Sequence, residues 1–174
     1  MEEVLLLTRR QAPRPLQLAQ HWRLALPAHE RLQLRGRRLC QDGQAVLLQL
    51  PRQAPLQPGE WLLPPAAAEQ GAAMPPVAVE VLAAREALLE VRGPHPLALL
   101  QAAYHLGNRH VGLEIRVGEL RLLDDPVLAH LLEHRGLEVG RITAPFQPER
   151  GAYGPSHGHS HGHHHDPSPV AGQG

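Results

Sequence analysis

The stretch EALLEVRGPHPLALLQAAYHLGNRHVGLEIRVGELRLLDDPVLAHLLEHRGLEVGRI, residues 86–142, decides the fold of this chain. Short apolar runs bounded by Gly, Pro and Asp alternate in it with two segments whose apolar residues recur at the helical period of 3.6. The elements expected, in chain order, are a strand at 86–92, a helix at 97–106, strands at 111–117 and 119–123, a helix at 126–135 and a strand at 137–142. This β-α-β-β-α-β order is typical of the ferredoxin-like arrangement.

The first of these helices has an apolar face and a possible stop signal. Leu97, Leu100 and Tyr104 recur at helical spacing and share one side of it. Gly107 follows the periodic residues, and glycine takes the left-handed conformation after a helix without strain. The sequence therefore predicts that the helix ends with Gly107 in that conformation.

The second helix has signals at both ends. Asp125 is placed to cap it, Pro126 suits its first position, and Gly136 is expected to end it. Its predicted apolar stripe consists of Val127, Leu128, Leu131 and Leu132.

Residues 1–85 have a different sequence pattern. Short apolar runs are separated there by Pro and Gly turns, which is typical of a small all-β unit. The candidate strands are Val4–Thr8, Trp22–Leu26, Arg31–Arg35, Ala45–Leu50 and Glu60–Leu63, and alternation continues at Val77–Val81. Four prolines in the segment 64–76 predict a long loop or linker. The fold class is therefore α+β, with a β-rich domain at 1–85, a ferredoxin-like domain at 86–146 and a tail at 147–174.

Composition excludes several classes of protein. Seventeen basic and seventeen acidic residues give no net charge that would draw the chain to nucleic acid or membrane. A local basic patch is interpreted as a solvated face, or as a docking surface for an acidic partner, because the second domain has no aromatic residues on its candidate strands for stacking RNA bases. The patch consists of Arg31, Arg35, Arg37 and Arg38.

Cys40 is the single cysteine, so the chain has no disulfide framework or CxxC zinc site, and any metal must be held by nitrogen and oxygen. An acidic N-terminus without a signal-peptide pattern, and no apolar run of membrane-spanning length, favour a cytoplasmic protein. No nucleophile, zinc-protease or P-loop motif occurs, so we do not expect an enzyme.

The tail points to metal capture. Six of the thirteen histidines fall within the nine residues HGHSHGHHH, and they are His157, His159, His161, His163, His164 and His165. Neutral imidazole suits Ni²⁺, Cu²⁺ or Zn²⁺, and its affinity for them should fall as pH drops through about 6.5. The glycines and serine that interrupt the run, and the nine residues after it, argue against a purification tag. We expect this tail to be disordered until it binds an ion, and its sites to be labile.

Histidines outside the tail give a second group of candidates. His110 ends the motif YHLGNRH at 104–110; one imidazole holds an ion weakly, but two brought together by a two-fold axis could hold it well. His105, near the end of a helix, is expected to be structural, although it stays a minor candidate ligand. His130 and His134 have the i, i+4 spacing that can chelate, but they lie off the leucine stripe and can equally form a solvated flank.

The motifs YHLGNRH (104–110), GELRLL (118–123) and APFQPERGAYG (144–154), followed by a histidine-rich end, resemble the UreE family of urease accessory proteins. The resemblance is best over residues 86–165, and the N-terminal half matches only in its β-rich character and in phrases such as LLQLPR (47–52). It implies a nickel metallochaperone that forms a homodimer through its second domain. The N-terminal domain would be similar to a peptide-binding domain of Hsp40-type chaperones.

The same resemblance implies the site and the partners. His110 would face its symmetry mate and hold one Ni²⁺ between the subunits, with tail histidines completing the shell; Zn²⁺ or Cu²⁺ could substitute. The partners would be the GTPase UreG and the urease accessory complex with apo-urease. Two alternatives stay open: a metal storage or buffering protein without a delivery role, and a peptide-binding adaptor in which metal only regulates assembly.

Overall fold

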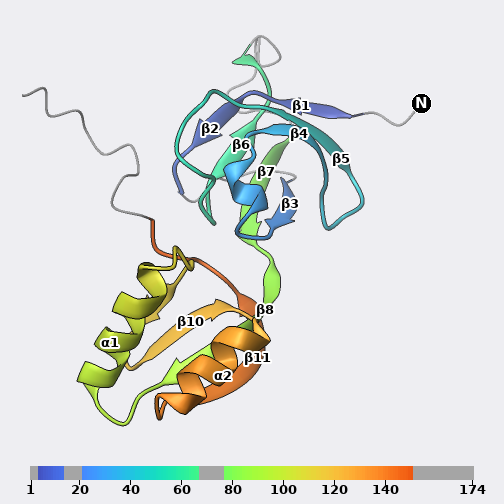
Figure 1. Cartoon of the computed structure of the whole chain (residues 1–174). Helices are drawn as coiled ribbons and strands as arrows, with labels where there is room; N and C mark the ends of the chain where they lie inside the picture. The colour runs from blue at the N-terminus through green and yellow to red at the C-terminus, as the bar shows by residue number, and fades with distance from the viewer. Residues whose placement is uncertain (1–3, 14–20, 67–76, 151–174) are drawn as a thin grey trace, which may run out of the picture.

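The computed structural model describes residues 4–13, 21–66 and 77–150, and it has the α+β architecture that the sequence predicts (Figure 1). The chain first forms a β-rich part and then a four-stranded sheet with two helices. The elements of the β-rich part are β1 (Leu5–Leu7), β2 (Arg9–Gln11), β3 (His21–Leu26), the 3-10 helix η1 (Glu30–Leu32), β4 (Arg35–Leu39), β5 (Ala45–Gln49), β6 (Trp61–Leu63) and β7 (Ala78–Ala83).

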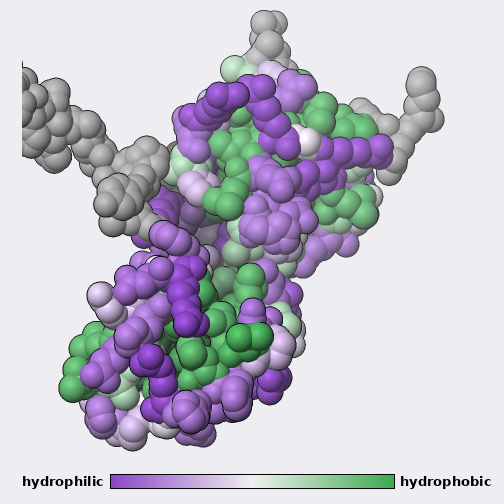
Figure 2. Space-filling view, viewed as in Figure 1, coloured by the Kyte–Doolittle hydropathy of each residue, from purple (hydrophilic) through white to green (hydrophobic). Residues whose placement is uncertain are grey.

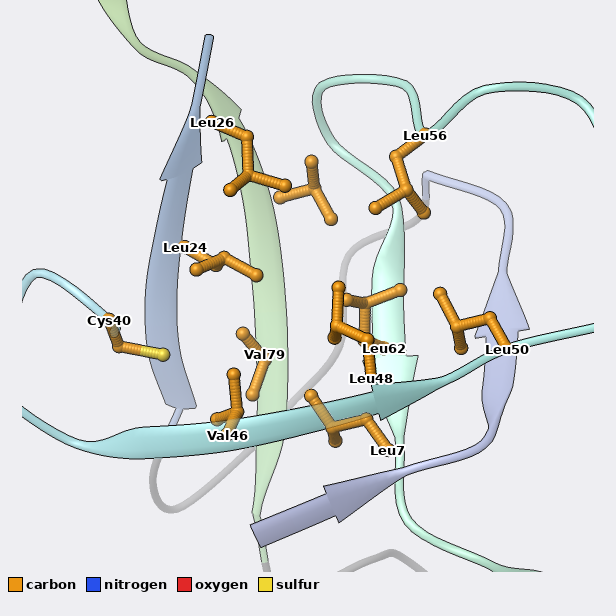
Figure 3. Packing of buried hydrophobic residues seen from close by; sticks show 11 residues of the cluster. Leu7, Leu24, Leu26, Cys40, Val46, Leu48, Leu50, Leu56, Leu62 and Val79 are labelled. Carbon is orange, nitrogen blue, oxygen red and sulfur yellow. The ribbon is translucent and has the colours of Figure 1, made fainter. Parts of the chain in front are cut away.

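Two sheets enclose the core of the β-rich part. One has the order β1-β5-β4 and the other β2-β6-β7-β3. Leu7 and Leu48 from the first sheet meet Leu24, Leu62 and Val79 from the second, all of them fully buried (Figure 3). A chain with one Phe and two Trp has to fill such a core with aliphatic side chains.

Cys40 lies at the side of this core, 3% exposed. Burial, together with the nearby Asp42 carboxylate, raises the pKa of its thiol to about 11. The thiol therefore stays protonated near neutral pH and is a poor metal ligand.

The prediction of a strand at Arg31–Arg35 is wrong. The backbone turns there as η1, with the amide of Gln33 donating to the carbonyl of Glu30 at 2.9 Å, and β4 begins only at Arg35. Arg31 is also 5% exposed, so it does not belong to the solvated basic patch. Its side chain turns inward and donates to the carbonyl of Leu26 at 3.0 Å, which favours the helical turn over an extended segment.

The other expected strands of this part are present, while β2 and the full extent of β4 were not anticipated. Most of the predicted loop at 64–76 lies outside the described residues. The C-terminal part contains β8 (Arg85–Arg92), α1 (Pro96–Gly107), β9 (Glu114–Arg116), β10 (Glu119–Leu123), α2 (Pro126–His134) and β11 (Glu138–Pro145).

The C-terminal sheet has the order β11-β8-β10-β9, with every neighbouring pair antiparallel, and both helices cover one face of it (Figure 1). This confirms the ferredoxin-like prediction. Its core is aliphatic and lies between helices and sheet, with Leu89 and Leu122 from the strands fully buried against Leu106 and Leu132 of the helices.

The face of α1 that we expected to be its apolar side points to solvent. Leu97, Leu100 and Tyr104 are 57%, 67% and 67% exposed. The side that packs on the sheet carries small residues and leucines instead, with Ala102 and Leu106 buried. Small side chains let the helix approach the sheet closely, and this leaves the larger apolar residues outside.

Candidate metal centre

His110 lies in the turn that ends α1. The amide of His110 donates to the carbonyl of Gly107 at 2.9 Å, and the amide of Val111 donates to that of Leu106 at 3.2 Å. This pair of bonds is the Schellman motif, in which the residue after the C-cap adopts the left-handed conformation. That residue is His110, with a φ of 58°, and no other non-glycine residue among those described has a positive φ.

The prediction that Gly107 takes the left-handed position is therefore wrong. Gly107 is the last residue of the helix, and the chain continues through Asn108 in helical conformation before it turns. A side chain in the left-handed region costs about 1–2 kcal/mol relative to glycine. Strain of this kind at an exposed histidine is the type of backbone feature that clusters at functional sites.

An apolar stripe leads along α1 towards this turn. It consists of Leu97, Leu100 and Tyr104, spaced three and four residues apart, so they form one continuous line on the helix surface. Hydrophobic surface is visible on the outer side of α1 in Figure 2. A partner that covers this stripe would lie close to His110.

The minor candidates lie elsewhere. His105 is half-buried and its ring makes an edge contact with Tyr104, with centroids 5.6 Å apart. His130 and His134 are both exposed on α2, with their rings stacked at a centroid distance of 6.5 Å. Within the described part of the chain, no three residues among His, Cys, Asp and Glu come together as a metal site. The six tail histidines, 157–165, lie outside the described residues.

Carboxylates on the sheet are engaged with arginines. Glu90 accepts from Arg121 at 2.8 Å and from Arg92 at 2.9 Å, and Glu119 pairs with the same two arginines at 2.8 and 2.6 Å. The hydrogen bond from Arg92 is the main cause that lowers the pKa of the Glu90 carboxyl. These acids are stabilised by cations of the same sheet, so they do not form an open acidic metal site.

Two long-range contacts of the segment after β11 were not predicted from the sequence. Glu114 at the start of β9 is 8% exposed and accepts hydrogen bonds from Arg116 and from the backbone of Gln147. Arg31 donates to the carbonyl of Phe146 at 2.7 Å. These pairs are 33 and 115 residues apart along the chain, so no local pattern signals them.

The comparisons agree with this architecture. The model of the UreE urease accessory protein C-terminal domain matches residues 86–169. A urease accessory protein UreE of Parasynechococcus marenigrum is 54% identical over 136 residues, which cover 78% of this chain and 85% of that protein. The chain belongs to the UreE family.

Further UreE relatives cover most of the chain as well. The urease accessory protein UreE of Synechococcus sp. (strain WH7805) is 53% identical, covering 77% of this chain and 73% of that protein. That of Thermosynechococcus vestitus is 46% identical, covering 81% and 92%. The prediction of the family is confirmed, and this UreE-family protein is an accessory protein of urease and not an enzyme.

No helix in the described part of the UreE-family chain is long and apolar enough to cross a membrane.

Proposed function

We propose that this UreE-family protein is a cytoplasmic nickel metallochaperone that binds Ni²⁺ between two copies of His110 and delivers it for urease maturation. The observation that carries the proposal is the strained, exposed His110 at the end of a helix whose apolar stripe is uncovered. The tail histidines gather the ion and complete its shell. Zn²⁺ and Cu²⁺ bind the same imidazoles, since the usual affinity order places Cu²⁺ above Ni²⁺.

The apolar stripe of α1 supports the dimer. Three large apolar side chains at 57–67% exposure are costly to leave in water, and a second copy of the same stripe can cover them. An isologous interface presents each residue twice around its axis. Two copies of the turn that follows α1 then approach each other, and each contributes one imidazole.

The chemistry of this centre suits transfer. Imidazole ligands leave one at a time, so the ion can move through mixed intermediates in which donor and acceptor proteins share it. The proposed acceptor is the GTPase UreG, acting with the urease accessory complex and apo-urease. Selectivity for nickel then comes from supply and from the acceptor, because imidazole alone does not discriminate against Cu²⁺.

The dimer is tested by placing a charge on the stripe. We expect Leu100→Glu to give a monomer in sedimentation equilibrium and to lose tight Ni²⁺ binding, because burying a carboxylate at the axis is unfavourable. Leu39→Glu is the matched control, since Leu39 is 65% exposed on β4 and should leave both dimer and metal affinity unchanged. A Leu100→Glu protein that stays dimeric would refute the interface.

Delivery is tested by following the ion. The full chain loaded with Ni²⁺ is mixed with the apo-GTPase, the proteins are separated, and nickel is measured in each. We expect most of the nickel to move to the GTPase, and to move slowly or not at all from a His110→Ala chain. If no nickel leaves the unchanged protein, storage is the better description.

A further inference from the structure

The outer face of α2 presents two histidines side by side. His130 and His134 are four residues apart on this helix, so their Cβ atoms lie about 5–6 Å from each other on one side of it. Both residues are exposed, and their rings stack at a centroid distance of 6.5 Å with 27° between the ring planes. The backbone therefore holds two imidazoles next to each other in water.

The helix that carries these rings is fixed at both ends. Asp125 caps its start with two hydrogen bonds, and the hydrogen-bonded turn at Gly136 closes its end. The opposite side of α2 packs on the sheet, where Ala129 and Leu132 are buried (Figure 1). A site on the outer face needs only side-chain rotation, because the backbone already sets the spacing of the two imidazoles.

The fold does not use the ring nitrogens of this pair. Among the residues that the structure describes, neither ring has a hydrogen-bond or ion-pair partner, and each ring contacts the other. His95, by contrast, uses its Nδ1 to accept from the amide of Ala98. Neutral imidazoles on α2 therefore keep their lone pairs available for a ligand.

Two neighbouring imidazoles can bind one divalent cation of the late first row. Metal–nitrogen bonds of about 2.0–2.1 Å place two adjacent ligand nitrogens roughly 3 Å apart. The rings reach that separation by rotation of exposed side chains, which is fast and leaves the backbone in place. Imidazole suits Ni²⁺, Cu²⁺ and Zn²⁺, whereas Mg²⁺ and Ca²⁺ prefer oxygen. His134 also stands in the last turn of α2, where the helix dipole favours a positive charge.

We propose that His130 and His134 form a second metal site, which takes one Ni²⁺, Cu²⁺ or Zn²⁺ ion on the outer face of α2. The protein supplies two ligands, and water completes the coordination sphere because this face is open to solvent. Structural sites are closed by four protein ligands, so an ion held by two exchanges readily with solution. The site goes beyond the proposed function, since it needs neither His110 nor a second copy of the chain.

The test follows the NMR signals of α2 while Ni²⁺ alone is added to the full chain. Octahedral Ni²⁺ is paramagnetic and broadens the signals of nearby amides, so residues 129–135 report an ion bound at this pair. We expect the Kd obtained from these signals to rise on the order of 100-fold in His130→Ala and in His134→Ala, because the second ligand binds in an intramolecular step. Two imidazoles that bound independently would instead show a change of about twofold or less.

The matched control exchanges two neighbouring residues. His134→Arg combined with Arg135→His keeps the composition and charge of α2, but it places the two histidines about 140° apart around the helix. Arg135 is the exposed C-cap residue, so the exchange disturbs no buried side chain. We expect this double variant to bind Ni²⁺ at α2 as weakly as His130→Ala does. A double variant that binds as tightly as the unchanged chain would overturn the proposal.

A further variant separates this site from the one proposed at His110. His110→Ala should leave the Kd obtained from the α2 signals unchanged, even though it removes the proposed ligand between the subunits. If His110→Ala abolished the broadening at α2, the ion would belong to the other centre and the second site would be refuted. The second site would also be refuted if Ni²⁺ left the α2 signals of the unchanged chain unaffected.

Discussion

The two helices of the C-terminal part end in the same hydrogen-bonded turn but place different residues at its left-handed position. After α2, the amide of Gly136 donates to the carbonyl of Glu133 at 2.9 Å and that of Leu137 to Leu132 at 3.2 Å. After α1 the same two bonds have the same lengths, with His110 in the place of Gly136. The φ angles are 77° for Gly136 and 58° for His110.

The difference between Gly136 and His110 distinguishes the residue that the fold favours at this position from the residue that a metal site requires. Glycine is the residue of lowest energy in this turn, and the chain uses it after α2. After α1 the chain keeps a side chain that strains the backbone by about 1–2 kcal/mol. The imidazole is thus retained at a position where the fold alone would favour glycine.

Replacing His110 by glycine should have the largest effect, because it changes both the metal binding and the backbone strain of the turn. We expect tight Ni²⁺ affinity to fall by on the order of 100-fold, about 2.7 kcal/mol, because both bridging imidazoles of the dimer are lost. The free energy of unfolding should rise by about 1 kcal/mol, since the strain is relieved. Calorimetry with Ni²⁺ and urea denaturation of the metal-free protein measure the two effects.

His110→Ala is the control for this variant, because it removes the imidazole but keeps a Cβ in the left-handed region. It should lose the same nickel affinity without the gain in stability. Equal stabilities of the glycine and alanine variants would show that the turn at His110 is not strained.

Placing a side chain at Gly136, the equivalent position after α2, should have an intermediate effect, and only on the free energy of unfolding. Nothing lies within 4 Å of a Cβ built on Gly136, so Gly136→Ala causes no collision and its cost comes from the backbone alone. We expect a loss of about 1–2 kcal/mol in the free energy of unfolding with unchanged nickel affinity. If Gly136→Ala lowered the nickel affinity of the folded protein in urea-free buffer, the turn after α2 would not be independent of the metal centre.

Periodicity and turn residues were sufficient to predict the order of elements in the C-terminal part, and the N-cap of α2 at Asp125 is confirmed. The orientation of α1 was not predictable in this way. Its sequence LALLQAAYHL is apolar on two sides, and the packing of Ala102 against the sheet, not the period, decides which side is buried. The strand expected at Arg31–Arg35 is absent for a similar reason. A buried hydrogen bond to the carbonyl of Phe146, 115 residues away in the sequence, fixes the side chain of Arg31.

The site was predictable in part. The motif ending at His110 marked that histidine as a candidate ligand, but the rule that favours glycine after a helix pointed to Gly107, three residues too early. Local sequence carries no sign that the chain after β11 brings the amide of Gln147 to the carboxylate of Glu114. Such contacts depend on strand order, which a single sequence specifies only through its whole fold.

The N-caps of the two helices give the smallest expected difference in the free energy of unfolding. Asp125 caps α2 by accepting from the amides of Val127 and Leu128 at 2.7 and 3.0 Å, whereas His95 caps α1 through one bond, from Ala98 to Nδ1 at 3.2 Å. Asp125→Ala should therefore cost about 1 kcal/mol in the free energy of unfolding, and His95→Ala only about 0.5 kcal/mol or less. Urea denaturation at neutral pH measures both.

The caps also provide a control for the metal centre, because His95 and His110 stand at opposite ends of α1. Nickel affinity should therefore stay unchanged in His95→Ala, as measured by calorimetry. A loss of nickel affinity would mean that the start of the helix contributes to the metal centre. A stability loss in His95→Ala as large as that in Asp125→Ala would contradict the argument that one hydrogen bond at the start of α1 stabilises less than two at the start of α2.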